Sequence, residues 1–217
     1  MRTTGECHPT VPATPPARPA ESRRLGLLRS GARLALVAGV AALGLLGAAF
    51  PACSQESLIK GLYLEGGVAP HSDGNTHAVA AGVLLSGSPA DTLRNSRTDF
   101  YWDVFGSGWR APSTTDGRRN YLQLGVIATL RYRFDEGRSP WFADAGFGIS
   151  TMDHHYQTPS REFSTDFQFT EALGLGFNFG EHRQYELSMR LQHVSNGGIR
   201  EPNPGENFVR LRGSYLF

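Results

Sequence analysis

The chain has 217 residues, of which 40% are hydrophobic and 26 are glycine, and its formal net charge is +1 at neutral pH. This near-neutral charge gives no electrostatic reason to expect a nucleic-acid partner, and the length suits one domain with a full core or one small barrel. Because glycine, phenylalanine and tyrosine are frequent, the composition favours many short strands over helices.

The N-terminal quarter of the chain has the features of a leader. Residues 1–23 contain five prolines and no apolar run, so we interpret them as disordered or as the product of a start codon placed too far upstream. Residues 24–54 join several arginines to the apolar run 34–50, which is typical of a cleaved signal peptide. A single transmembrane anchor is the alternative, for which this run is short. The predicted exported domain is 55–217.

The exported domain contains about eight segments in which apolar and polar residues alternate. Each has around ten residues or more, the length of a tilted strand that crosses a bilayer. A soluble β-sandwich would alternate in the same way, so alternation alone does not establish a membrane barrel. The predicted strands are 58–69, 77–86, 98–108, 120–134, 140–152, 163–179, 185–195 and 206–217.

The polar faces of these segments favour the barrel. They carry charges of both signs, as expected where ions pair inside a small barrel that its own side chains fill. The fold is therefore predicted to be all-β, an eight-stranded antiparallel transmembrane β-barrel with a polar, side-chain-filled interior. The charges expected inside are Asp99, Asp103, Arg131, Arg133, Asp144, Asp166, Glu186, Arg190, Arg210 and Arg212.

The connections between the segments give the barrel a direction. Short links alternate with longer ones, as periplasmic turns alternate with extracellular loops. The short links are 135–139 and 180–184, and the longer ones are 109–119, 153–162 and 196–205. With both termini in the periplasm, strand 185–195 runs outward, and Trp141, Tyr121 and Tyr215 are expected in aromatic girdles. This predicts the outer membrane of a Gram-negative bacterium as the location.

Strand 185–195 ends in residues that point to chemistry. Its apolar face continues into His193 and Ser195. Residues two apart on a strand share a face, with Cα atoms roughly 6–7 Å apart, so the imidazole and the hydroxyl lie within reach of each other. The loop that follows offers amides to an oxyanion or a substrate, from Asn196, Gly198 and Asn203. Polar residues at the rim of a lipid-facing stripe also occur simply at the water interface.

These residues form a longer motif. His193-Val194-Ser195-Asn196-Gly197-Gly198, followed by Pro202-Asn203-Pro204-Gly205, resembles the His-x-Ser-Asn-x-Gly and Pro-Asn-x-Gly signature of the PagL family, which are outer-membrane lipid A 3-O-deacylases. The resemblance implies a serine esterase, without metal, that removes the 3-hydroxyacyl chain from position 3 of the reducing glucosamine of lipid A. It implies Ser195 as the nucleophile, His193 as the base, and Asn203 with the backbone amide of Gly198 as oxyanion donors.

The acid of the triad departs from the family pattern. The position of the family's glutamate falls on Asn207, and Glu206 lies one residue too early. Strict alternation points Asn207 outward with the apolar face and Glu206 inward, although alternation often breaks at strand ends. Glu206 is the first candidate because of its position relative to the family motif.

Strand pairing suggests a second acid independently of the resemblance. Glu171 is a single charge on the apolar face of its strand, where a carboxylate is costly. If the last short link pairs Phe179 with Tyr185, the register places Glu171 directly opposite His193, where side chains lie about 4.5–5.5 Å apart. Glu171 is therefore the second candidate acid, ahead of Asn207.

The remaining polar residues suggest no further chemistry. His71, His154 and His155 fall in predicted outer loops, and no histidine pair has a zinc-site spacing with cysteine. Cys7 and Cys53 both precede the exported domain, so we expect no disulfide in it. We expect no cofactor, no metal and no nucleic acid. The resemblance implies lipid A or lipopolysaccharide in the membrane as the partner, and a homodimer is left open. The alternatives to the esterase are a non-catalytic structural or adhesive barrel and another envelope acyltransferase.

Overall fold

The computed structural model describes residues 57–71 and 74–217. The segments predicted to be a disordered start and a signal peptide, 1–23 and 24–54, lie outside these residues. Within the described part of the chain, no helix is long and apolar enough to cross a membrane.

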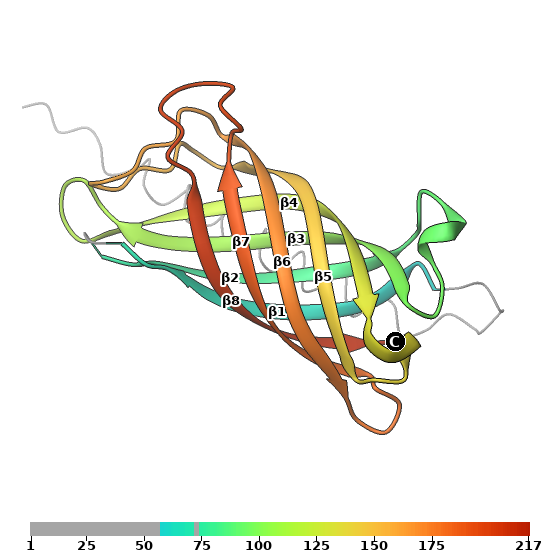
Figure 1. The fold of residues 1–217 in the computed structure, drawn as a ribbon. Helices are drawn as coiled ribbons and strands as arrows, with labels where there is room; N and C mark the ends of the chain where they lie inside the picture. Colours follow the sequence, from blue (N-terminus) through green and yellow to red (C-terminus); the bar gives the residue numbers. More distant parts are fainter. Residues whose placement is uncertain (1–56, 72–73) are drawn as a thin grey trace, which may run out of the picture. The chain divides into compact units, whose positions relative to one another are not determined.

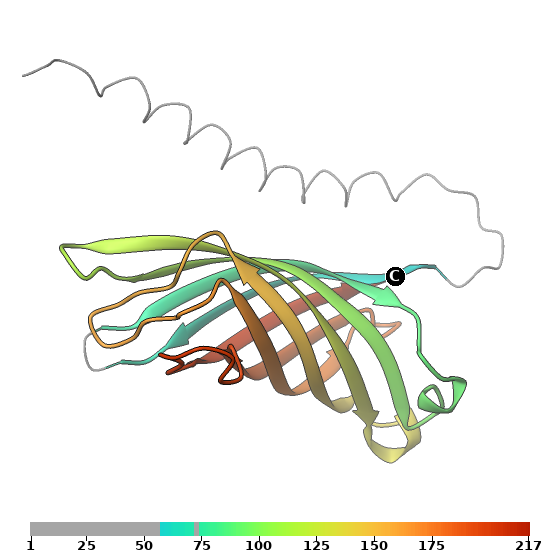
Figure 2. The same cartoon turned by 90° about the horizontal axis from the view of Figure 1, so that it is seen from above.

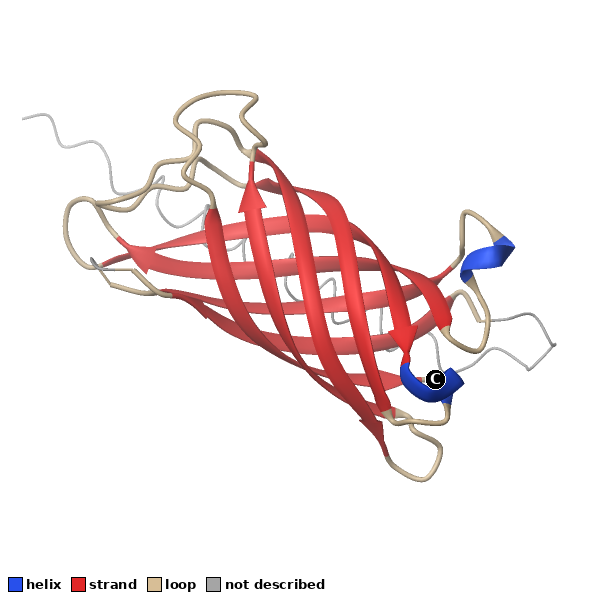
Figure 3. Ribbon diagram, in the orientation of Figure 1, coloured by secondary structure: helices blue, strands red, loops and turns tan. Residues whose placement is uncertain are grey.

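The described residues form a closed barrel of eight antiparallel strands in chain order (Figures 1 and 3). The strands are β1 (Ile59–Ala69), β2 (Thr76–Ser86), β3 (Thr98–Pro112), β4 (Arg118–Arg133), β5 (Trp141–Met152), β6 (Phe167–Phe179), β7 (Tyr185–Ser195) and β8 (Glu206–Leu216), with short 3-10 helices at Asp91–Leu93 and Phe134–Gly137. Each strand pairs with the next, and β8 closes the barrel on β1. The prediction of an eight-stranded antiparallel barrel is confirmed.

The hairpin of β3 and β4 is longer than predicted. The two strands stay paired as far as Pro112 and Arg118, so the expected outer loop 109–119 is reduced to the turn 113–117. The tip of this hairpin is the outermost point of the coloured ribbon at its end of the barrel in Figure 2. Near its tip Trp109 is buried inside the barrel, and this packing favours continued pairing where the sequence pattern suggested a loop.

Paired ions fill much of the barrel interior. Glu65 accepts hydrogen bonds from Arg190, Arg210 and Arg212 at 3.5, 3.0 and 2.8 Å, and Asp103 accepts from Arg190 and Arg212 at 3.1 and 2.8 Å. All five side chains are buried. Buried charges persist in proteins when they are paired and hydrogen-bonded. The expected polar, side-chain-filled interior is therefore present in this part of the barrel, whereas apolar side chains fill the other end.

A second ionic group joins Arg131 to Asp144 and Glu186, all three buried. One expected interior charge is placed elsewhere. The prediction for Asp166 was wrong, because β6 begins only at Phe167. The Asp166 side chain is 47% exposed in the preceding loop.

The outside of the barrel is apolar. Alternate strand residues expose large hydrophobic side chains, such as Leu64, Leu173 and Leu211, over an area far larger than the apolar patches of soluble proteins. Near the end of the barrel where the chain terminates, aromatic rings contact one another in a continuous belt. The belt consists of Trp141, Phe177, Phe179, Tyr185, Tyr215 and Phe217. An apolar wall bordered by an aromatic girdle is the design of a bilayer-spanning barrel.

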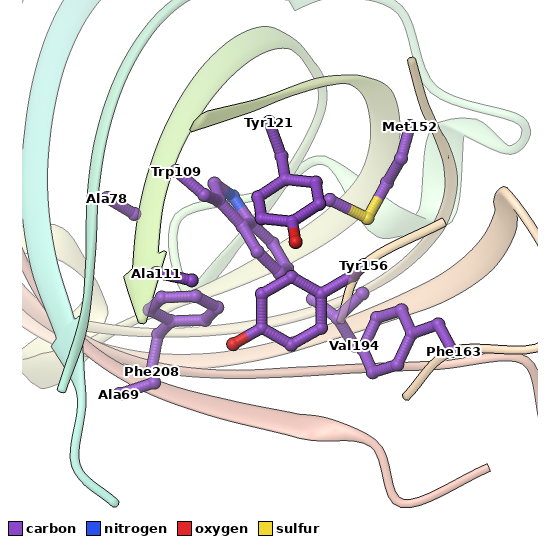
Figure 4. Close-up of a cluster of buried hydrophobic side chains, with 10 residues drawn as sticks. All are labelled: Ala69, Ala78, Trp109, Ala111, Tyr121, Met152, Tyr156, Phe163, Val194 and Phe208. Atoms are coloured by element: carbon purple, nitrogen blue, oxygen red, sulfur yellow. The ribbon is translucent and has the colours of Figure 1, made fainter. Parts of the chain in front are cut away.

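An apolar cluster fills the interior at the opposite end (Figure 4). Trp109 contacts Tyr156 and Phe208 with ring centroids 5.3 and 4.6 Å apart, and Phe163 packs on Tyr156 from the loop before β6. Tyr121 belongs to this cluster and is 2% exposed. The expectation that Tyr121 lies in an outer girdle was wrong, because its side chain faces inward from β4.

Candidate active site

His193 and Ser195 lie at the end of β7, on the outside of the barrel. Val194, between them, is completely buried in the apolar cluster. Because side chains alternate along a strand, the burial of Val194 turns both neighbours outward. The predicted histidine and serine are thus on one face at the rim of the apolar wall, and both are partly exposed.

A polar residue flanks His193 on each neighbouring strand. Glu171 lies directly opposite on β6, and Asn207 lies directly opposite on β8. The register inferred by pairing Phe179 with Tyr185 is therefore confirmed.

The imidazole is oriented by Asn207. Its Oδ1 lies 2.8 Å from Nδ1 of His193. With this carbonyl oxygen as the acceptor, Nδ1 carries the proton and Nε2 keeps its lone pair. This is the tautomer that a general base needs.

The structure places Glu206, the first candidate acid, away from His193. Its side chain is 1% exposed and points into the barrel mouth. Its Oε2 lies 2.8 Å from His71 Nε2 and accepts a hydrogen bond from the Tyr156 hydroxyl at 2.8 Å. Burial, reinforced by the Glu206 carboxylate, raises the pKa of Tyr156 well above its ordinary value. Alternation holds to the first residues of β8, so Asn207 and Glu171, and not Glu206, are the two that lie beside His193.

The loop after β7 is organised by Asn196. Its side chain is buried; Nδ2 donates to the Arg200 carbonyl at 2.7 Å, and Oδ1 accepts from the Gly198 amide at 2.9 Å. The backbone amide of Asn196 in turn donates to Asn203 Oδ1 at 3.0 Å. Two of the three expected oxyanion residues thus hold the loop together, and the Gly198 amide is engaged within it. Gly198 has φ +80°, a conformation that favours glycine.

Gly205 packs directly against the His193 ring. A methyl group added at Gly205 would lie 2.7 Å from Cε1 and 3.2 Å from Nε2 of the imidazole, and φ is +63°. A side chain here would therefore displace the ring. The glycine is visible in the sequence motif, but its contact with His193 emerges only when the loop folds back.

An aromatic patch adjoins Ser195 on the outer wall. Phe169 lies opposite Ser195 across the β6–β7 pairing, Phe147 stacks on Phe169 at 5.8 Å, and Phe167 meets it edge-on at 5.3 Å. The hydroxyl is consequently bordered by a surface suited to acyl chains.

The sequence did not predict a group of buried and partly buried loop residues at this end of the barrel. His71, expected as an exposed loop histidine, has a side chain 4% exposed and contacts Glu206, and Tyr156 and Arg161 join the same group. No periodic pattern marks these loop residues. Among the described residues, no group of three or more His, Cys, Asp or Glu side chains is arranged to hold a metal ion.

Comparison with known proteins agrees with the motif. The family model for lipid A 3-O-deacylase (PagL) matches residues 82–215. The lipid A deacylase PagL of Bordetella bronchiseptica is 34% identical over 124 residues, which are 56% of this chain and 64% of that protein. The lipid A deacylase PagL of Pseudomonas aeruginosa is 23% identical over 105 residues, 48% of this chain and 57% of that protein. The chain thus spans less than two thirds of the length of these curated relatives.

A solved structure supports the fold. The crystal structure of the outer membrane enzyme PagL superimposes with a TM-score of 0.54 at 20% identity, over 71% of this chain and 99% of that one. The family match covers more than half of the chain and includes β6, β7, the loop after β7 and most of β8. The chain therefore belongs to the PagL family of lipid A 3-O-deacylases.

Proposed function

We propose that this chain is an outer-membrane serine esterase that hydrolyses the 3-O-linked 3-hydroxyacyl chain of lipid A. The observation that carries the proposal is the position of Ser195. It lies on the apolar outer wall, two residues from an imidazole whose Nε2 is the basic nitrogen, beside exposed aromatic rings. A hydroxyl in this position meets a substrate dissolved in the same leaflet, and lipid A presents its esters at the outer rim.

The reaction follows from these groups. The Ser195 oxygen attacks the ester carbonyl while Nε2 of His193 takes its proton, and the tetrahedral intermediate collapses to an acyl-enzyme as His193 returns the proton to the departing sugar hydroxyl. Water then attacks the acyl-enzyme with His193 as base and releases a 3-hydroxy fatty acid. The Asn203 amide donates to the oxyanion, joined by the Gly198 amide when it exchanges its bond to Asn196 for one to the substrate.

In this proposal, two residues share the role of the triad's acid: one orients the histidine and the other supplies the negative charge. Asn207 fixes the ring and its tautomer through the 2.8 Å contact with Nδ1. Glu171, opposite His193 on the other side, supplies the negative charge that stabilises the imidazolium. The carboxylate that a triad needs thus lies on β6, while the orienting oxygen remains on β8.

Mass spectrometry of lipid A tests the function. Gram-negative cells that express the parent chain should lose one 3-hydroxyacyl mass from lipid A, and cells that express Ser195→Ala at equal folded-barrel yield should not. Free fatty acid as the product identifies hydrolysis, whereas an acylated alcohol identifies transfer. Unmodified lipid A from cells that contain the folded parent barrel would contradict the proposal and favour a structural barrel.

A further inference from the structure

A partly buried chain of hydrogen bonds links two extracellular loops to the back of the His193 ring. It begins at Arg161, in the loop between β5 and β6, whose Nε donates to Nδ1 of His71 at 3.2 Å. His71, in the loop after β1, contacts Glu206 through Nε2 at 2.8 Å. Glu206 Oε1 accepts the backbone amide of Asn207 at 2.9 Å. This chain of hydrogen bonds therefore ends on Asn207, the residue that orients His193.

The direction of the hydrogen bonds fixes the state of His71. A guanidinium has only donors, so Nδ1 of His71 must be the acceptor and is unprotonated. Nε2 then carries the proton and donates it to Glu206. The bonds thus run one way from Arg161 through His71 to the Glu206 carboxylate, which also accepts the Asn207 backbone amide from the other side.

Arg161 also holds the backbone behind the imidazole. Its Nη1 donates to the carbonyls of Pro204 and Gly205 at 3.1 and 2.7 Å. Gly205 forms the wall against Cε1 and Nε2 of His193. A shift of that wall changes where Nε2 points, and Nε2 is the atom that must receive the serine proton.

We infer that Arg161, His71 and Glu206 are positioning residues that set the orientation of His193 through Gly205 and Asn207. The inference rests on the proposed esterase function. It assigns Glu206, the carboxylate adjacent to the family's acid position, to the support of the triad and not to the triad itself. Arg161 then acts without touching substrate, although it is a cation at the extracellular end of the barrel.

Kinetics on the purified, folded full chain with lipid A in detergent micelles separate positioning from substrate binding. Arg161→Gln should lower kcat by about tenfold to a hundredfold, because misplacing a catalytic group by about 1 Å costs that much. KM should stay within about twofold, since no substrate contact is lost. The matched control is Arg119→Gln, which removes an exposed cation near the start of β4, in the hairpin of β3 and β4. Its kcat and KM should equal those of the parent.

Two substitutions of His71 test the hydrogen-bond chain itself. In His71→Gln the amide oxygen can accept from Arg161 and the amide nitrogen can donate to Glu206, so activity should be largely retained. His71→Leu offers neither and should resemble Arg161→Gln. An equal loss of kcat in both His71 variants would overturn the positioning role of these residues. A parent-like kcat in both Arg161→Gln and His71→Leu would overturn it as well. A raised KM at unchanged kcat would instead make Arg161 a substrate-binding residue and would also overturn it.

A spectroscopic readout keeps this inference separate from the esterase proposal. In chain labelled with 15N-histidine, with the His193 signals assigned through His193→Gln, the parent should show one fixed tautomer protonated at Nδ1. Arg161→Gln should shift or broaden those signals toward tautomer averaging, and Arg119→Gln should not. Unchanged His193 signals in Arg161→Gln would overturn the positioning inference even if the enzyme is active. If the parent is inactive but Arg161→Gln still shifts the His193 signals, the esterase proposal is contradicted and the positioning inference is supported.

Discussion

Glu171→Gln removes the negative charge beside His193 without changing the size of the side chain. The Cβ atoms of directly opposite residues on antiparallel strands lie about 5 Å apart, and we take this value as the separation of the two charges. At this distance a unit charge stabilises an imidazolium by about 0.8 kcal/mol in water and about 3 kcal/mol at a partly screened protein surface. The Glu171 side chain is exposed, so we expect a loss of about 1–2 kcal/mol of transition-state stabilisation, which is about a five- to thirtyfold lower kcat.

The assay is release of 3-hydroxy fatty acid from lipid A in micelles, measured by mass spectrometry at several salt concentrations. Leu173→Gln, two residues along the same outward face of β6, is the control for a new amide on the apolar wall. Screening by salt should reduce the difference between the parent and Glu171→Gln, because the interaction is between exposed charges.

Moving the charge across the site gives the sharpest test. In the double variant Glu171→Gln with Asn207→Glu, the carboxylate leaves β6 and appears on β8 at the residue that contacts His193 Nδ1. We expect kcat to recover to the parent value or above it, since one group then both orients and stabilises the ring. A parent-like kcat in the single variant Glu171→Gln would refute the role given to Glu171.

Three further substitutions test the packing around the site and the interior. Gly205→Ala places a methyl group 2.7 Å from His193 Cε1 and should lower kcat at least about tenfold, whereas a parent-like rate would show that the ring has room to move; strain at positive φ costs about 1–3 kcal/mol. Glu65→Gln leaves buried arginines without their carboxylate and should lower the free energy of unfolding in urea by about 3–5 kcal/mol; a change below 1 kcal/mol would contradict the ion-pair account. The raised pKa of Tyr156 means that its contribution to stability is complete below about pH 10, the ordinary tyrosine value, and declines as pH rises above it. Tyr156→Phe should therefore be less stable than the parent at pH 8 but lose less stability between pH 9 and 11, and parallel pH profiles would argue against this.

The sequence predicted the fold well because each strand of a membrane barrel alternates apolar residues that face lipid with residues that face the interior. Period-two alternation, together with charges of both signs on the polar faces of the strands, was sufficient to predict the number of strands, their antiparallel order and a polar interior. The short link 180–184, taken to pair Phe179 with Tyr185, predicted the register of β6 and β7, and with it the position of Glu171 opposite His193. Strand ends were less well predicted: β3 continues to Pro112, because its ladder is maintained by buried packing that has no local signature.

The local sequence also determined which residues of the site share a face. His193 and Ser195 point outward together because Val194 between them is apolar and buried. By contrast, only the tertiary structure decided the fate of Glu206, for which family position and alternation gave opposite answers. Its carboxylate turns inward because His71 and Tyr156, from two separate loops, are there to satisfy it, and a buried carboxylate needs such partners. Contacts of this kind join residues far apart in the chain, so no spacing along the sequence encodes them.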